Sequence, residues 1–131
     1  MIHAGDFITP FTAKDFSDLD CPFTGVFGNN DGERLGLASA YNGLGPLHAV
    51  STEMEIAGRR IYTRHEPDAI EAIAQSGHYD VVIYGHTHQI DVREVGNTWI
   101  VNPGECCGWV TGRSTIVLFD LEAMEPTVID L

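Results

Sequence analysis

The sequence predicts an α/β (α+β) protein built as a two-sheet β-sandwich flanked by helices. Helical and strand-like segments alternate in the first part of the chain, whereas five strand-like segments follow one another after residue 79. The apolar run VVIY at residues 81–84 is typical of a central strand that is covered on both faces. The chain has 131 residues, which suits one hydrophobic core, so we expect a single domain over residues 1–131.

The first half of the chain combines short helices and short strands. A Thr-Pro opening with amphipathic spacing predicts a short helix near residues 12–19. The apolar stretch at 21–28 predicts a strand that ends in a Gly-Asn-Asn-Asp-Gly loop. Residues 33–48 have loop and weakly helical character. Two alternating segments around an Ala-Gly pair predict a hairpin over 51–65.

The second half contains the clearest helix and then the run of strands. Pro67 suits the first turn of a helix, apolar residues recur at helical spacing, and Gly77 ends the segment. The strands that follow are expected to form an antiparallel meander, and Gly96-Asn97 predicts a tight turn between two of them.

Charge and composition narrow the possible partners. Nineteen acidic residues face seven basic ones, giving a net charge of −12, so nucleic-acid binding is not expected. The acids are spread along the chain, which favours a halophilic, salt-rich cytoplasm as the setting. No apolar run is long enough to span a membrane and no signal peptide is visible, so we expect a cytoplasmic protein without a membrane partner. The three cysteines have no metal-ligand spacing and are expected to be buried free thiols.

Three strand-like segments end in the same way, with a glycine followed by side chains that bind metals. Asp6 follows the first, Asn29 follows the second, and His86 and His88 follow the third. The glycine lets the chain turn sharply, and the carboxyl ends of strands in α/β sheets are where ligands bind. A mixed set of oxygen and nitrogen ligands suits Mn²⁺, Fe²⁺, Ni²⁺ or Zn²⁺ better than Ca²⁺ or Mg²⁺. The sequence therefore predicts a site for a divalent metal.

The motifs GD, GNND and GHTH, in this order, resemble three motifs of the calcineurin-like metallophosphoesterases. The run YDVVIYGHTH, followed by VNPGECCG, is similar to the small single-domain phosphodiesterases of that superfamily. The resemblance implies a hydrolase with two metal ions, in which activated water attacks a small phosphoester in line. It further implies that Asp6 bridges both ions, that Asn29 and His86 serve one, and that His88 serves the other. Pro103 would fix the turn that shapes the wall of the site.

The sequence departs from the family pattern at its beginning. In the family a strand ending in Asp-x-His precedes the Gly-Asp motif, whereas here only MIHA does. We therefore expect a metallophosphoesterase-like fold without its first strand and helix, with impaired activity and with one metal ion or none. His3 lies before Gly5 within the strand and is not expected to replace the missing ligands.

Two further positions bear on the site. The family has a ligand histidine where this chain reads IYTRHEPD. An ungapped alignment places Thr63 there, whereas a local shift would make His65 the ligand, and the sequence leaves both open. Asn30 occupies the position of a histidine that assists the leaving group in many superfamily members. Small phosphodiesterases often have Asn or Asp there, so Asn30 is a candidate catalytic residue.

The leading interpretation is a metal-dependent phosphodiesterase. The alternative is a non-catalytic metallophosphoesterase-like module with a structural or protein-binding role. Loss of a central strand would expose apolar sheet edges, and exposed edges pair with other chains. We therefore expect a homodimer or a larger homo-oligomer.

Overall fold

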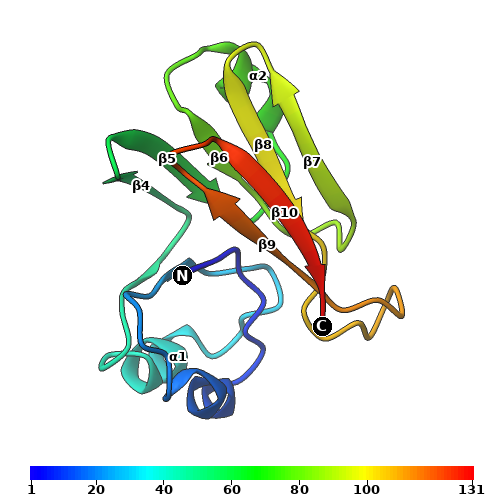
Figure 1. Ribbon diagram of the computed structural model, residues 1–131. Helices are drawn as coiled ribbons and strands as arrows, with labels where there is room; N and C mark the ends of the chain where they lie inside the picture. The colour runs from blue at the N-terminus through cyan, green and yellow to red at the C-terminus, as the bar shows by residue number, and fades with distance from the viewer.

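Five strands form the main sheet of the computed structural model, which describes residues 1–131 (Figure 1). The strand order is β4-β5-β6-β8-β7, in which β5, β6 and β8 run parallel and the two edge strands run antiparallel to their neighbours. The bounds are Ser51–Ile56 for β4, Arg59–Arg64 for β5, Val81–Ile83 for β6, Ile90–Val95 for β7 and Thr98–Pro103 for β8. The hairpin expected over 51–65 and the turn at Gly96-Asn97 are both confirmed.

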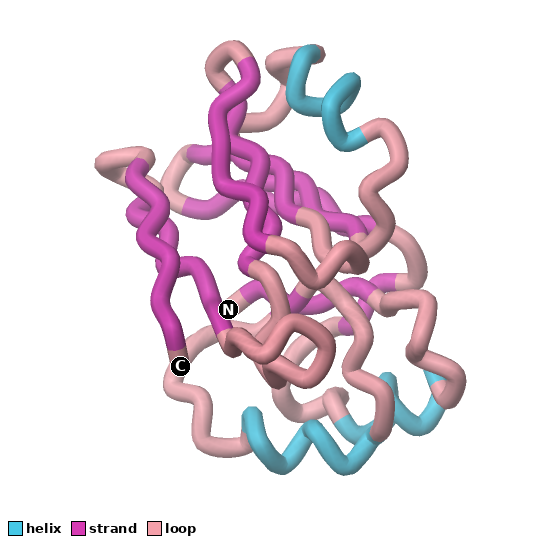
Figure 2. Tube along the Cα trace, turned by 90° about the vertical axis from the view of Figure 1, so that its right-hand side faces the viewer, coloured by secondary structure: helices cyan, strands magenta, loops and turns pink.

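Both faces of the main sheet are covered, so β6 is central as its apolar run predicts. Val82 is fully buried on the face under helix α2 (Ile70–Gln75), in a cluster with Ile70 and Ile100. Val81 is buried on the opposite face, where β9 (Thr115–Asp120) lies over the sheet. Figure 2 shows these layers, with the pair β9 and β10 (Glu125–Asp130) on one side of the sheet and α2 on the other.

The antiparallel meander expected after residue 79 is only partly correct. β7 and β8 are antiparallel, as are β9 and β10, but β6 pairs in parallel with β5 and β8 rather than with β7. The connection from β5 through α2 to β6 is a crossover, and a crossover makes the two strands that it joins parallel. The pair β9–β10 then forms a sheet of its own, so the protein has three hydrogen-bonded sheets instead of the two expected.

The third sheet is parallel and lies near the amino terminus. Its order is β1-β2-β3, with β1 at Ile2–His3, β2 at Thr24–Val26 and β3 at Leu47–His48. A 3-10 helix η1 (Pro10–Phe16) and helix α1 (Arg34–Ala40) pack beside it. The helix expected at 12–19 thus exists, but it is a 3-10 helix and begins at Pro10, capped by Thr9.

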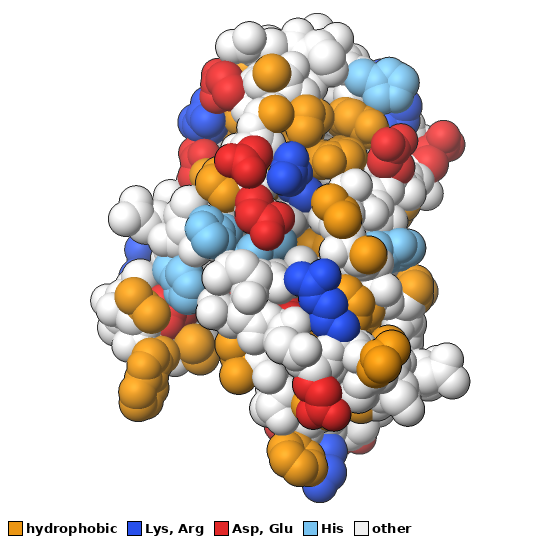
Figure 3. All heavy atoms as spheres, turned by 180° about the vertical axis from the view of Figure 1, so that it is seen from behind, with side chains coloured by type: hydrophobic (Ala, Val, Ile, Leu, Met, Phe, Trp, Pro, Cys, Tyr) orange, Lys and Arg blue, Asp and Glu red, His pale blue; other side chains and the backbone are white.

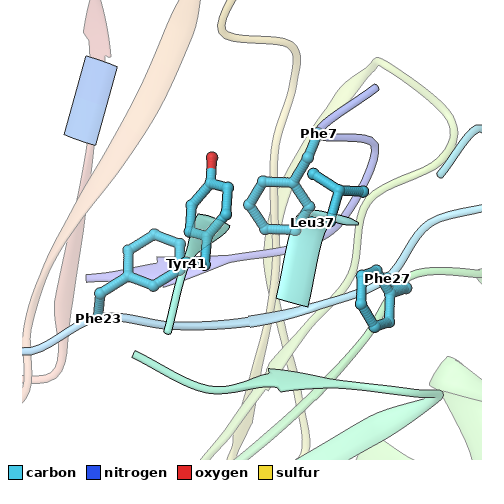
Figure 4. Close-up of a cluster of buried hydrophobic side chains, with 5 residues drawn as sticks. All are labelled: Phe7, Phe23, Phe27, Leu37 and Tyr41. Atoms are coloured by element: carbon cyan, nitrogen blue, oxygen red, sulfur yellow. The ribbon is translucent and has the colours of Figure 1, made fainter. Parts of the chain in front are cut away.

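An aromatic cluster holds this amino-terminal part together (Figure 4). Leu37 and Tyr41 lie one helical turn apart and are both fully buried. The ring of Phe7 packs against Tyr41 with 4.9 Å between centroids, and Phe23 packs against the same tyrosine at 5.4 Å. Phe7 follows Asp6 directly, so this packing fixes the segment that carries the first polar strand end.

The cysteines and the helices give two further findings. Cys21, Cys106 and Cys107 are free, but all three are exposed, so the expectation of buried thiols is wrong. Cys106 and Cys107 lie in the loop after β8 instead of in the core.

Helix α2 is shorter than the predicted segment 67–77, and no helix is long and apolar enough to cross a membrane.

Candidate metal centre

Four of the candidate metal ligands follow four strands of two sheets. Asp6 follows β1 and Asn29 follows β2, while His65 follows β5 and His86 follows β6. Because each of these strands is parallel to its neighbour, their carboxyl ends meet at one side of the molecule. Histidine side chains gather on this part of the surface, as Figure 3 shows.

Asn29 is the contact point between the histidines. Its Oδ1 lies 2.8 Å from His65 Nε2 and 2.8 Å from His86 Nδ1. The two imidazole rings are nearly perpendicular, with 5.2 Å between their centroids. His65 Nε2 is also 3.5 Å from Asp6 Oδ2. The structure therefore brings Asp6, Asn29, His65 and His86 together.

The structure also distinguishes the two alternatives left open around β5. Thr63 lies inside the strand, fully buried, and its hydroxyl has no hydrogen-bond partner. His65 lies just past the strand end and reaches both Asn29 and Asp6. The structure thus brings His65, and not Thr63, into the cluster, and its role as the ligand stays a prediction.

The hydrogen bonds of His65 show that the cluster suits a cation. Its Nδ1 is 2.6 Å from the carbonyl oxygen of Ala4, and a carbonyl only accepts, so Nδ1 carries the proton. In the neutral ring Nε2 then has a lone pair, which faces the oxygens of Asn29 and Asp6. His65 is 1% exposed, so its ring is shielded from bulk solvent. A cation between them would satisfy all three, because each offers it a lone pair.

The donor set contains an amide as well as acidic and imidazole groups. No group of three or more His, Cys, Asp and Glu side chains is spaced to hold a metal ion by itself. Asn29 supplies the atom that His65 and His86 share. A carboxylate, an amide oxygen and two imidazoles form a set that first-row divalent metals accept.

Three of the seven non-glycine residues with positive φ are candidate site residues. Asp6, His86 and His88 have φ of 60°, 65° and 60°, a region that L-residues rarely occupy. A backbone conformation of this kind typically costs on the order of 1–3 kcal/mol per residue, and it persists where the surrounding structure holds it. The clustering of three at the strand ends supports a functional role for this part of the chain.

The glycines that precede Asp6, Asn29 and His86 act in two different ways. Gly5 has a φ of 104° and makes the sharp turn that the sequence suggested. Gly28 and Gly85 do not have positive φ, and their role is close approach. A Cβ at Gly28 would collide with the carboxylate of Asp6, and one at Gly85 would lie 2.9 Å from the carbonyl oxygen of Ala4. Any side chain at either position would therefore push the strand ends apart.

Asp31 also belongs to this arrangement, although the sequence did not identify it as a candidate site residue. It is 3% exposed, and its Oδ2 accepts hydrogen bonds from the backbone N–H of Asp6 at 3.0 Å and of Gly28 at 2.7 Å. Its Oδ1 accepts from the N–H of Ile8 at 2.8 Å. One carboxylate thus joins the ends of β1 and β2. The only signal in the sequence is its place as the last residue of GNND.

Asn30, the candidate catalytic residue, contacts Asp6 directly. Its backbone N–H donates to Asp6 Oδ1 and its side-chain amide donates to Asp6 Oδ2, both at 2.9 Å. Its side chain is exposed, so it lies at the open edge of the cluster.

His88 makes its ring contact away from Asn29. Its Nδ1 is 3.3 Å from Oε2 of Glu105, which is 6% exposed. Burial alone would raise the pKa of Glu105, but hydrogen bonds from the Val110 N–H, the Cys107 thiol and Thr111 outweigh it and lower the pKa to about 2. The Glu105 carboxylate is therefore ionised beside the imidazole. His88 also lines a surface cavity of about 310 Å³.

His3 is half-buried and packs against an aromatic ring. Its ring stacks on Phe7 with 4.0 Å between centroids, and its Nδ1 accepts from the N–H of Gly5 at 3.2 Å. Burial lowers its pKa to about 4, although the nearby Asp31 and Asp6 act in the opposite direction. A surface cavity of about 420 Å³ lies between Ser17 and Leu44, and none of the cluster residues line it.

The chain belongs to the calcineurin-like phosphoesterase superfamily, whose domain model matches residues 1–124. It is 39% identical over 129 residues to phosphodiesterase MJ0936 of Methanocaldococcus jannaschii, and the match covers 95% of this chain and 78% of that protein. The solved structure of an archaeal phosphodiesterase has a TM-score of 0.92 at 38% identity, covering 99% of this chain and 81% of the other.

More distant structures share the fold alone. Vacuolar protein sorting 29 of Cryptosporidium parvum is 16% identical, with a TM-score of 0.63 over 98% of this chain and 78% of that one. The family expected from the sequence and the mixed α/β fold with sheets and flanking helices are both confirmed.

Proposed function

We propose that this phosphoesterase-family chain is a metal-dependent phosphodiesterase that hydrolyses a small phosphoester. The observation that carries the proposal is geometric: His65 Nε2 lies 2.8 Å from Asn29 Oδ1 and 3.5 Å from Asp6 Oδ2, while its Nδ1 is bound to the carbonyl oxygen of Ala4, a set of groups that a cation would bring together. The 39% identical relative, which is a phosphodiesterase, supports the same reaction.

The proposed ligands divide between two ions. Asp6, Asn29, His65 and His86 would hold one ion, of Mn²⁺, Ni²⁺, Fe²⁺ or Zn²⁺. Asp6 and His88 would contribute to a second. A bound divalent metal lowers the pKa of water and neutralises charge on phosphoryl oxygens.

The remaining residues of the site prepare these ligands. Asp31 fixes the backbone that carries Asp6, and Ala4 fixes the proton of His65 on Nδ1. The side-chain amide of Asn30 is 2.9 Å from Asp6 Oδ2 at the open edge of the cluster. We propose that its N–H donates to a phosphoryl oxygen of the substrate.

The test combines a Mn²⁺ titration by calorimetry with hydrolysis of a chromogenic phosphodiester. His65→Ala should abolish Mn²⁺ binding at the Asn29 cluster and any turnover. His78→Ala removes an exposed imidazole that contacts Arg60 instead, and it should change neither. Unaltered Mn²⁺ affinity in His65→Ala would show that the cluster is not the metal centre.

One observation favours the non-catalytic alternative. The His88 ring hydrogen-bonds to Glu105, whereas the other histidines of the site meet at Asn29. The contacts that support metal binding are therefore those of the cluster at Asn29, and we propose impaired turnover for this polypeptide. Stoichiometric metal binding without phosphodiester hydrolysis, even at high enzyme concentration, would support a structural or protein-binding module.

We also propose that the chain forms a homodimer or larger homo-oligomer. β1 and β9 each have a hydrogen-bonded neighbour on one side only. Ile2 of β1 and Val117 of β9 pack on the same core cluster, which places two sheet edges at one side of the main sheet. Cytoplasmic location and a salt-rich host stay predictions from composition.

A further inference from the structure

The carboxylate of Glu105 has four donors around it and no Lys or Arg. Oε1 accepts from the N–H of Val110 at 2.7 Å and from the thiol of Cys107 at 3.3 Å. Oε2 accepts from the N–H of Thr111 at 3.1 Å and is 3.3 Å from His88 Nδ1. His88 is its one ion-pair partner. A carboxylate that is 6% exposed thus joins the loop after β8 to an imidazole of the site.

We infer that Glu105 is a positioning residue for His88, holding its proton on Nδ1 so that Nε2 keeps a free lone pair. Both carboxylate oxygens already accept from backbone N–H groups, Oε1 from Val110 and Oε2 from Thr111, so the Nδ1 that faces Oε2 is the donor. Carboxylates that accept from the second nitrogen of a metal-binding histidine fix its tautomer and its ring orientation in the same way. The consequence for metal binding rests on the function proposed above, whereas the tautomer does not.

The backbone of His88 is consistent with this role. Its φ of 60° is a conformation that the surroundings must hold in place. The Glu105 side chain supplies such a hold from a loop seventeen residues further along the chain.

Glu105→Gln is a discriminating substitution because it keeps the shape and removes one acceptor. In one orientation the amide nitrogen takes the Oε2 position. There it would oppose the N–H of Thr111, since both are donors, and it would donate a hydrogen bond to His88 Nδ1. The proton of His88 would then move to Nε2. In the other orientation the amide nitrogen takes the Oε1 position and opposes the N–H of Val110, which makes the shortest of the four contacts. The first orientation is favoured because it keeps that contact.

Asp130→Asn is the matched control. The Asp130 carboxylate binds Arg113 at the far end of the same loop, with Oδ2 2.9 Å from Nη2, and it contacts no histidine. This variant removes the same charge and loosens the same loop. If Glu105 served only to order the loop, both variants would act alike on His88.

The test is the tautomer of His88 in the metal-free chain, read from long-range ¹H–¹⁵N correlations at pH 8 and assigned by the loss of signals in His88→Gln. The wild type and Asp130→Asn should show the proton on Nδ1, and Glu105→Gln should show it on Nε2. A proton on Nε2 in the wild type, or an unchanged tautomer in Glu105→Gln, overturns the inference. The wild-type spectrum decides the question even if Glu105→Gln does not fold.

A second measurement connects the tautomer to the metal. Mn²⁺ affinity at the site that includes His88 should fall about 10–100-fold in Glu105→Gln and stay unchanged in Asp130→Asn. A wild-type chain that binds no metal and hydrolyses nothing would refute the proposed function, while the tautomer would still decide the role of Glu105.

Discussion

Asp31→Asn tests whether one buried carboxylate fixes the geometry of the strand ends. The substitution keeps the size of the side chain but replaces one oxygen by an NH₂ group. The less damaging orientation puts this group at the Oδ1 position, where it opposes the N–H of Ile8 and keeps the bonds to Asp6 and Gly28. One charge-assisted hydrogen bond is then lost and a buried donor is left unpaired.

The expected loss follows from the number of bonds affected. Hydrogen bonds to charged groups contribute about 1.5–3 kcal/mol each, and the two retained bonds weaken when the acceptor becomes neutral. We therefore expect Asp31→Asn to lower the free energy of unfolding by about 2–4 kcal/mol. Asp31→Ala removes all three bonds and should lower it further, by an amount comparable with the total stability of a small domain, about 5–15 kcal/mol.

The assay is urea unfolding followed by circular dichroism, with Mn²⁺ affinity measured on the folded variant. Asp20→Asn is the control, because Asp20 is exposed and the charge change is the same. Equal unfolding free energies for Asp31→Asn and Asp20→Asn would refute the reasoning. A destabilised Asp31→Asn with unchanged Mn²⁺ affinity would show that Asp31 supports the fold but not the position of Asp6.

Three further results are expected. Burial lowers the pKa of His3 from 6.5 to about 4, so the folded state binds fewer protons than the unfolded state in this interval. Stability should thus fall as the pH drops from 6.5 to 4, by about 1.4 kcal/mol per pH unit at most, and urea titrations of His3→Gln should show a weaker decline. Leu37→Ala should cost about 2–5 kcal/mol in the same titration, because Leu37 is fully buried in the aromatic cluster, whereas the exposed Leu35→Ala should cost little. Light scattering should give a mass above the 14.3 kDa of one chain, and a monomer at micromolar concentration would contradict the proposed oligomer.

The strand ends could be predicted because their signals are local. A glycine followed by a ligand-type side chain after an apolar run identifies Asp6, Asn29 and His86 without knowledge of the fold. The apolar run of β6 likewise indicates a strand that is covered on both faces, and Val81 and Val82 are buried on opposite faces. These features depend on neighbours in the sequence, which is why a single sequence contains them.

The features that were missed depend on distant contacts. Nothing near β6 indicates that it pairs with β8 instead of β7, since the pairing depends on β7 lying at the edge of the sheet and on the β7–β8 hairpin bringing β8 back beside β6. Asp31 and Glu105 resemble ordinary loop acids in the sequence, and only the folded chain brings distant backbone N–H groups or an imidazole to them. The role of His65 was left open because the ungapped alignment to the family motif places Thr63, two positions earlier, at the ligand position.

The four residues of the cluster, Asp6, Asn29, His65 and His86, follow strands of two separate sheets, and they are spread from residue 6 to residue 86 of the chain. A single ion bound by them would therefore act as a cross-link between the two sheets. An unfolded chain has no equivalent site, so the free energy of binding would be added to the free energy of unfolding, about 2.7 kcal/mol when the metal concentration is a hundred times its Kd. The melting temperature would then report the metal content of the preparation, and a chelator would lower it without any change in the sequence.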